Sequence, residues 1–364
     1  MFSKSNLRKS VSAPFLIIGN KFSDVGSPDI TYVVERKNWS IKWDGIQLCK
    51  HVSLNSDYKA KVSSWPFLFG GKILHFGSQF HWQNWHDIVR GKGKIIVNYF
   101  HGKPTDGKGF EQHFNYFIKR FNEIDLVTVP NDLTEKLLLD HDVDRSKIIK
   151  VPIGVDTEIF TPSEKPSSFF KNKFGLPEDR CIIGSFQKDG NGWGKGETPK
   201  LIKGPDLFVE LVAELNKKLP VFVFLTGPAR GYVKKRLEAY NIPYKHLFFN
   251  DYLSIVDAYR ALDLYLMTSR EEGGPKAILE CCATKTPIFS NSVGMAPEVF
   301  SGNLNKFLLT GEPDIDTELI AEFLSDKDTD KSMADKMLLR AKDFDWSNIS
   351  RDLIKNVYNP LLGS

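Results

Sequence analysis

Short apolar runs alternate along the chain with segments in which hydrophobic residues recur every three or four positions. The runs are continuous rather than alternating, which is typical of parallel strands buried on both faces. The segments between them predict amphipathic helices, and the clearest begins at Gly204-Pro205 and places its apolar residues on one stripe. We predict strands over residues 15–18, 72–76, 95–100, 126–129, 148–151, 181–186, 221–225, 246–249, 264–267 and 287–290. This order of elements indicates an α/β fold with parallel sheets.

One stretch, residues 161–180, interrupts the alternation and is rich in Pro, Ser, Lys and Phe, which is typical of a linker. A chain of 364 residues is also long enough for two domains of ordinary size. We therefore predict a first α/β domain over residues 1–160, a second over residues 161–344, and a C-terminal helix in residues 345–364 that returns to the first domain.

The composition excludes several classes of protein but does not identify a function. Hydrophobic residues make up 41% and charged residues 26%, a normal globular balance. The net charge of +4 is too small to indicate nucleic-acid binding, but it suits an anionic substrate or a loose association with a membrane surface. Four cysteines do not predict a disulfide framework. Because no apolar run approaches the ~20 residues of a membrane span, we expect a cytoplasmic protein that can work at the inner membrane surface.

The most informative segment follows the strand predicted at residues 264–267. It contains two carboxylates, Glu272 and Glu280, which bracket the turn Gly273-Gly274-Pro275. A strand, a Gly-rich turn and a helix in this order present backbone N–H groups and a positive helix end to an anion. Glu272 and Glu280 then lie more than a helical turn apart, where they can contact different parts of one extended ligand. On spacing alone, an acidic turn followed by a solvated helix face is an equally good interpretation.

Three basic residues also follow predicted strands, and ligands of open α/β sheets bind beyond the carboxyl ends of strands. His101 follows residues 95–100, Lys203 closes a Gly-rich stretch after residues 181–186, and Arg230 follows residues 221–225. Each has an ordinary alternative: a core or capping role for His101 and a surface position for Lys203. For Arg230, a contact with a donor phosphate and a surface position carry equal weight.

Several motifs in a fixed order resemble one known group, the retaining glycosyltransferases of family 4, which have the GT-B fold and use nucleotide sugars. The motifs that carry the resemblance are Val151–Asp156, Lys203-Gly204, Tyr259–Asp263, Glu272 to Glu280, Thr286-Pro287 and Pro297-Glu298-Val299. The resemblance implies two Rossmann-like, doubly wound parallel-sheet domains that face each other across a cleft. The first domain would bind the acceptor and the second would bind the donor.

The resemblance also implies roles for residues of the second domain. Glu272 would contact the hydroxyls of the donor sugar, beside the backbone of Gly273, Gly274 and Pro275. Glu280 would accept hydrogen bonds from the ribose, and Lys203 would neutralise the diphosphate leaving group.

Two further roles are implied at the edges of this site. His101 would reach the donor sugar from the first domain. The family has a second cation, an arginine, where this chain offers Gln187 or Lys188; we favour Lys188 because it is charged. Lys188 and Arg230 would then contact the donor phosphates.

The predicted function is that of a retaining hexosyltransferase in polysaccharide biosynthesis. It would move a sugar from UDP or GDP to a glycan or lipid-linked acceptor, without a metal cofactor. The alternatives are another GT-B enzyme, a nucleotide-sugar epimerase or a sugar phosphorylase, and a non-catalytic protein that binds a glycan or a nucleotide. The triplets Asp142–Asp144 and Asp314–Asp316 suggest a metal-dependent site, but such triplets are common by chance and neither follows a convincing strand. Trp82 and Trp85 suit core packing better than stacking on an acceptor sugar.

Overall fold

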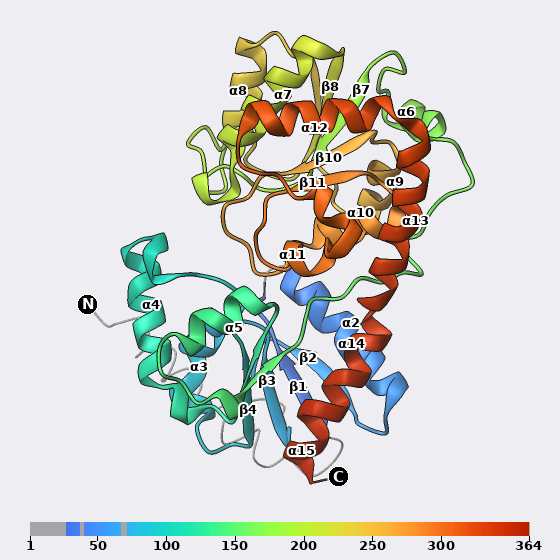
Figure 1. Cartoon of the computed structure of the whole chain (residues 1–364). Helices are drawn as coiled ribbons and strands as arrows, with labels where there is room; N and C mark the ends of the chain where they lie inside the picture. Colours follow the sequence, from blue (N-terminus) through green and yellow to red (C-terminus); the bar gives the residue numbers. More distant parts are fainter. Residues whose placement is uncertain (1–26, 37–39, 67–70, 364) are drawn as a thin grey trace. The chain divides into compact units, whose positions relative to one another are not determined.

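The chain divides into two compact units in the computed structural model, which describes residues 27–36, 40–66 and 71–363 (Figure 1). The first unit comprises the chain up to Gly154 together with Trp346–Ser364, and the second comprises Val155–Asp345. The predicted boundaries fell at residues 160 and 344. The strand predicted at residues 15–18 lies outside the described residues.

The first unit is built on a parallel sheet of six strands in the order β2-β1-β3-β4-β5-β6, counted over the described residues. Four of the strands match apolar runs in the sequence, whereas β1 and β2 were not predicted. The strands are β1 (Ile30–Val33), β2 (Ala60–Ser63), β3 (Ile73–Phe76), β4 (Lys94–Asn98), β5 (Leu126–Val129) and β6 (Ile148–Lys150). The core of the unit includes Trp82 and Trp85, so the prediction that they are core residues is confirmed.

Right-handed crossovers place helices on both faces of this sheet, because the chain adds β2 on one side of β1 and β3 to β6 on the other. Helices α3 and α4 pack against each other, while α2 packs against the C-terminal helix α14 (Figure 1). The bounds are α2 (Ser40–Asn55), α3 (Gln79–Val89), α4 (Lys108–Lys119), α5 (Asp132–Leu139) and α14 (Trp346–Leu353). Ser78 and Asn131 cap α3 and α5 with their side-chain oxygens, which satisfies backbone donors that a helix start leaves open.

The end of the chain is integral to the first unit. After α14, the turn η7 (Ile354–Tyr358) leads into α15 (Asn359–Leu362). The Tyr358 hydroxyl lies 2.9 Å from His75 Nδ1 in the middle of β3, and the Tyr58 hydroxyl donates to Asn359 Oδ1 at 2.8 Å. Trp346 covers Gly154 so closely that a Cβ at residue 154 would lie 2.5 Å from the indole ring. Residues 346–364 therefore complete the first unit.

The second unit has a parallel sheet of five strands in the order β11-β10-β7-β8-β9. Their bounds are β7 (Cys181–Ser185), β8 (Val221–Thr226), β9 (Tyr244–Leu247), β10 (Leu264–Met267) and β11 (Ile288–Ser290). The apolar runs predicted all five, although β9 begins two residues before the predicted strand. From the central strand β7 the chain adds β8 and β9 on one side, and it then returns to add β10 and β11 on the other.

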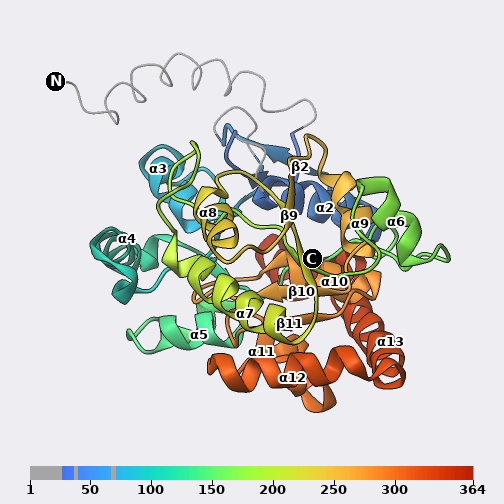
Figure 2. The same cartoon turned by 90° about the horizontal axis from the view of Figure 1, so that it is seen from above.

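The helices of the second unit form two layers around this sheet (Figure 2). Helix α7 packs against α8 and α12. Helices α9 and α10 pack against each other, α9 also packs against α6, and α10 also packs against α13. The bounds are α6 (Ser167–Phe174), α7 (Pro205–Lys218), α8 (Gly231–Ala239), α9 (Ile255–Arg260), α10 (Lys276–Thr284), α11 (Ala296–Val299), α12 (Pro313–Ser325) and α13 (Lys327–Asp343). Cys281 and Cys282 are fully buried core residues of α10.

The linker predicted over residues 161–180 was wrong. That stretch contains α6, which buries Phe170 and Phe174 in the second unit. The Lys171 amine also forms an ion pair with Asp263, at 2.8 Å from Oδ2. Pro and Ser do occur in this segment, but two apolar residues four positions apart are enough to fix one helical face against the unit.

Candidate functional site

The sheet of the second unit reverses its strand order between β7 and β10, and the main candidate residues lie at that point. In open parallel sheets, ligands bind beyond the carboxyl ends of the strands where the order reverses. The connection after β7 carries Gln187, Lys188 and Lys203, and the connection after β10 carries Glu272. The topology thus places the predicted lysine and the predicted glutamate together.

Lys203 and Glu272 form an ion pair, with Nζ 2.5 Å from Oε1. Their side chains are 23% and 11% exposed, so the pair is largely withdrawn from water but still accessible. Ser269 adds a second donor to the same carboxylate oxygen, with its Oγ at 2.8 Å. A carboxylate and an ammonium paired in this way both retain the capacity to bind a further polar group.

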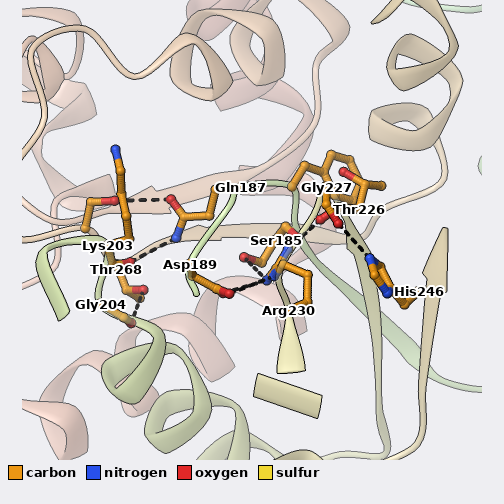
Figure 3. Close-up of polar contacts among 12 residues, drawn as sticks. Ser185, Gln187, Asp189, Lys203, Gly204, Thr226, Gly227, Arg230, His246 and Thr268 are labelled. Carbon is orange, nitrogen blue, oxygen red and sulfur yellow. Dashed lines mark hydrogen bonds and ion pairs between the residues drawn. The ribbon is translucent and has the colours of Figure 1, made fainter. Parts of the chain in front are cut away.

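Gln187 and Lys188 take different places in the structure. Gln187 Nε2 donates to the Lys203 carbonyl at 2.9 Å (Figure 3). The Ser269 hydroxyl, which also contacts Glu272, lies 3.2 Å from Gln187 Oε1. The Lys188 amine instead lies over the ring of Trp193, 4.2 Å from its centroid. Gln187 therefore links the lysine connection to the glutamate connection, while Lys188 supplies a charge at the side of the site.

The backbone of the two connections is also tied together. The Thr268 hydroxyl donates to the Gly204 carbonyl at 2.8 Å (Figure 3). Gly204 has a φ of +59°, and a Cβ at this position would lie 1.9 Å from the Thr268 carbonyl oxygen. Only glycine fits here, because it combines a left-handed conformation with direct contact between backbones. Nearby, Arg270 binds Asp206 through two nitrogen–oxygen contacts of 2.7 Å each.

Glu280 lies in α10 and is only 3% exposed. Its Oε2 accepts a hydrogen bond from the Tyr259 hydroxyl at 2.7 Å, and its Oε1 accepts one from the Tyr252 hydroxyl. Each carboxylate oxygen can accept more than one hydrogen bond, so the tyrosines orient the carboxylate without exhausting it. The role of Glu280 toward a ribose stays a prediction.

The structure does not place Arg230 where a donor phosphate could reach it. Arg230 is 1% exposed, and every nitrogen of its guanidinium has a protein partner. Nε donates to Asp189 Oδ1 at 3.0 Å, Nη1 donates to the carbonyls of Ser185 and Thr226, and Nη2 donates to the Ser185 hydroxyl at 3.0 Å (Figure 3). The two roles expected for Arg230, contact with a donor phosphate and a surface position, were therefore both wrong. Arg230 instead joins the ends of β7 and β8.

Comparison with known families decides the class of this unit. Residues 199–338, which include Lys203, Glu272 and Glu280, match the family described as Glycosyl transferases group 1. The whole chain is also similar to the crystal structure of Anabaena Alr3699/HepE in complex with UDP and glucose. The TM-score is 0.73 over 91% of this chain and 99% of that one, at 14% identity. The chain has the GT-B fold, and residues 199–338 of its second unit match the group 1 glycosyltransferase family.

Curated relatives of the glycosyltransferase domain agree with this assignment. A D-inositol 3-phosphate glycosyltransferase of Corynebacterium urealyticum is 24% identical over 229 residues, which are 59% of this chain and 52% of that protein. The lipopolysaccharide core biosynthesis mannosyltransferase LpsB of Rhizobium meliloti is 29% identical over 157 residues, which are 41% of this chain and 42% of that protein. The chain spans about half the length of the curated relatives it matches.

His101 belongs to the first unit of the GT-B fold, beyond the carboxyl end of β4. The buried side chain of Gln79 holds this segment: its Nε2 donates to the His101 carbonyl at 2.6 Å and its Oε1 accepts from the Phe100 N–H at 3.0 Å. The imidazole packs beside Phe80, with ring centroids 5.8 Å apart. Its reach to a donor sugar depends on the second unit and stays a prediction.

Sequence reasoning missed several residues that organise the two units. Ser269 lies inside the Glu272 motif and could have been noticed as a short hydroxyl donor three residues before the carboxylate. Asp189 and Gln79 gave no signal, because their partners are distant in sequence. Within the described residues, no group of three or more His, Cys, Asp or Glu side chains is arranged to hold a metal ion. In the same residues, no helix is long and apolar enough to cross a bilayer.

Proposed function

We propose that the protein is a retaining glycosyltransferase that moves a hexose from a nucleoside diphosphate sugar to a glycan or lipid-linked acceptor. The observation that carries the proposal is the Lys203–Glu272 pair, which lies at the strand-order reversal of the domain that matches the group 1 family. The pair offers a cation for a diphosphate and a carboxylate for sugar hydroxyls within one site.

In this proposal the pair exchanges partners when the donor binds. Lys203 turns from Glu272 to the diphosphate, and the freed Glu272 oxygen accepts from hydroxyls of the sugar. The arrangement keeps each charge compensated before and after binding, which matters because an unpaired charge is costly at low exposure. Ser269 and Gln187 stay in contact with each other and hold the two connections in place meanwhile.

The chemistry needs stabilisation of a developing negative charge. Cleavage of the sugar–phosphate bond leaves a nucleoside diphosphate and an oxocarbenium-like sugar. A preorganised ammonium stabilises that leaving group in a largely desolvated site, where such contacts are strongest. In a retaining reaction the leaving phosphate can take the proton of the acceptor hydroxyl, so no separate protein base is required. The residues of the site thus suit transfer without a metal ion.

The identity of the donor and the acceptor is part of the proposal. UDP is the favoured nucleotide, with GDP as the second choice, since HepE has been crystallised with UDP-glucose. A glycan or lipid-linked acceptor suits the names of the relatives, among them the lipopolysaccharide core mannosyltransferase. The net charge of +4 suits both an anionic donor and a peripheral contact with an anionic membrane surface.

Calorimetric titration of the EDTA-treated protein with UDP, GDP, ADP and CMP tests the proposal. We expect one nucleotide to bind without metal and this binding to weaken strongly in Lys203→Ala. Lys195→Ala is the matched control, because it removes a lysine from the same connection after β7. When the protein is incubated with the hexose conjugate of the nucleotide that binds, it should release that same nucleotide. Absence of binding by all four nucleotides, or binding that needs a metal ion, would contradict the proposal.

A further inference from the structure

The connection between β7 and α7 is a hairpin whose base is clamped by a buried ion pair. Residues 189–191 run antiparallel to residues 198–200: the Asn191 N–H donates to the Thr198 carbonyl at 2.9 Å, and the Lys200 N–H donates to the Asp189 carbonyl at 2.7 Å. The side chain of Asp189 pairs with Arg230, whose Nη2 lies 2.9 Å from Oδ2. Asp189 thus contacts Arg230 with its carboxylate and Lys200 with its backbone.

The hairpin is also fitted to the start of α8. The N–H groups of Gly231 and Tyr232 donate to the carbonyls of Lys195 and Gly196, at 2.8 and 2.9 Å. Gly196 approaches Ala229 so closely that a Cβ would lie 2.2 Å from the Ala229 carbonyl oxygen. The first backbone N–H groups of α8 therefore bind the hairpin. The hairpin is held both at its base and at Lys195 and Gly196.

Lys200 lies at the point where the clamped hairpin passes into the turn that ends at Lys203. The turn η4 (Leu201–Lys203) is a 3₁₀ helix with Lys200 as its N-cap, and the Lys203 N–H donates to the Lys200 carbonyl at 2.8 Å. Lys200 and Lys203 thus lie at the two ends of one short turn, and their ammonium groups are close enough for the two charges to interact. Leu201, between them, is 55% exposed and points elsewhere.

The charge environment of Lys200 is unusual for a lysine in a connection. Burial lowers its pKa, and the neighbouring ammonium groups of Lys203 and Lys188 lower it further, with only a smaller opposing effect from Glu272. Among the described residues, no side chain accepts a hydrogen bond from the Lys200 amine or forms an ion pair with it. Three positive charges and one negative charge therefore act on one another here, an excess of positive charge that a dianionic ligand would balance.

We infer that Lys200 is a second diphosphate-binding cation of the donor site, set beside Lys203 by the 3₁₀ turn and held there by the buried Arg230–Asp189 pair. This inference rests on the proposed function. Arg230 is then a positioning residue: it acts on the ligand through Asp189 and the hairpin, and the amine that touches phosphate belongs to Lys200.

The test compares Lys200→Gln with Lys195→Gln, which removes the same charge from the tip of the same hairpin. UDP, UMP and inorganic pyrophosphate are titrated by calorimetry without divalent metal. We expect Lys200→Gln to weaken UDP and pyrophosphate roughly tenfold or more, the loss typical of one charge-assisted hydrogen bond. UMP should lose less, and Lys195→Gln should change none of the three by more than about twofold.

The outcomes separate this inference from the proposed function. If the wild-type protein binds UDP and Lys200→Gln behaves as Lys195→Gln does, the role of Lys200 is overturned while the donor site stands. If the wild-type protein binds no nucleoside diphosphate, both fail. Equal losses for UDP and UMP would also overturn it, because they would place Lys200 away from the second phosphate.

The positioning role needs a readout that a loss of folding would not produce. In Asp189→Asn we expect weaker UDP binding, and in Asp189→Asn/Lys200→Gln we expect little further loss beyond Lys200→Gln alone. Such non-additivity shows that both changes act on one contact. Additive losses would assign the pair a purely structural role. If Asp189→Asn fails to fold, Arg230→Lys replaces it in the same comparison of single and double variants. Arg230→Lys keeps the charge but not the hydrogen-bonding pattern.

Discussion

Two ion pairs hold the connection after β7, one at the base of its hairpin and one at its end. The side chains of Arg230 and Asp189 are 0% and 1% exposed, and the arginine uses every guanidinium nitrogen on fixed protein partners. Lys203 and Glu272 are 23% and 11% exposed, and their pairing rests on a single nitrogen–oxygen contact. The Arg230–Asp189 pair is buried and fixes the position of the hairpin. The Lys203–Glu272 pair is accessible, and a ligand can take the place of either partner.

Removal of one partner from the buried pair should have the largest effect on folding. Asp189→Asn leaves the Arg230 charge buried without its counter-ion, which typically costs about 3–5 kcal/mol of the free energy of unfolding. The control is Asp206→Asn, which breaks the exposed Arg270 pair and should cost at most about 1 kcal/mol. Urea unfolding of the full chain measures both. Similar losses for the two variants would erase the distinction between buried and exposed pairs.

Removal of a partner from the accessible pair should affect chemistry rather than folding. We expect Glu272→Ala to lower kcat about a hundredfold to a thousandfold, the range for loss of one well-placed electrostatic contact, while nucleotide binding is mostly kept. Lys203→Ala should weaken both transfer and nucleotide binding. Steady-state rates and calorimetry on the two variants separate these effects. Wild-type activity in Glu272→Ala would remove this residue from the site.

The backbone contact between the two connections can be tested with two glycines that share a conformation. Gly204 and Gly192 have φ values of +59° and +71°, but a Cβ at Gly192 meets nothing within 4 Å. Substitution by alanine carries the same left-handed strain at both positions. Gly204→Ala should therefore cost about 1–3 kcal/mol more than Gly192→Ala, because it also forces overpacking. Equal thermal shifts of the two variants would mean that the connections separate easily.

The smallest effect concerns His75, a buried group of the first unit that forms no ion pair with any residue that the structure describes. Burial lowers its pKa from 6.5 to about 3, so the folded unit holds it neutral between Tyr32 and Tyr358. The stabilisation is complete above pH 6.5 and is lost as the pH falls toward 3, because the unfolded chain binds the proton first. From pH 7 to pH 5.5 this amounts to about 1 kcal/mol. His75→Gln should unfold with a flatter pH dependence in that range; an unchanged slope would refute the assignment.

The sequence predicts repeating local features well and long-range partners poorly. Strands such as Leu126–Val129 and Leu264–Met267 are continuous apolar runs, and the structure has them at those bounds. The strand β1 is a comparable short run that the prediction overlooked, whereas β2 has one buried residue in four, so no run identifies it. The helix α6 was hidden by neighbouring Pro and Ser residues that are common in linkers.

The candidate site shows the same limit. Glu272 and Lys203 were found because each follows a strand and lies in an ordered motif, and the topology then brings them together. Arg230 follows a strand too, but the sequence does not reveal that Asp189, 41 positions earlier, lies buried beside it. A charge beside a strand end predicts proximity to a ligand site. Whether that charge faces the ligand or the protein depends on partners that only the fold defines.

The return of residues 346–364 to the first unit has a consequence for synthesis on the ribosome. The second unit, Val155–Asp345, is fully translated before α14 exists, whereas the first unit waits for Trp346 to cover Gly154 and for Tyr358 to reach His75. We expect the domain translated second to mature first, since domains generally fold as units once their chain has emerged. Protease digestion of ribosome-bound chains, stalled on an added linker that carries residue 345 out of the exit tunnel, would show this as a resistant second unit beside a labile first one. The nascent first unit then exposes the apolar face of α2 for the longest time, which makes it the part most in need of a chaperone.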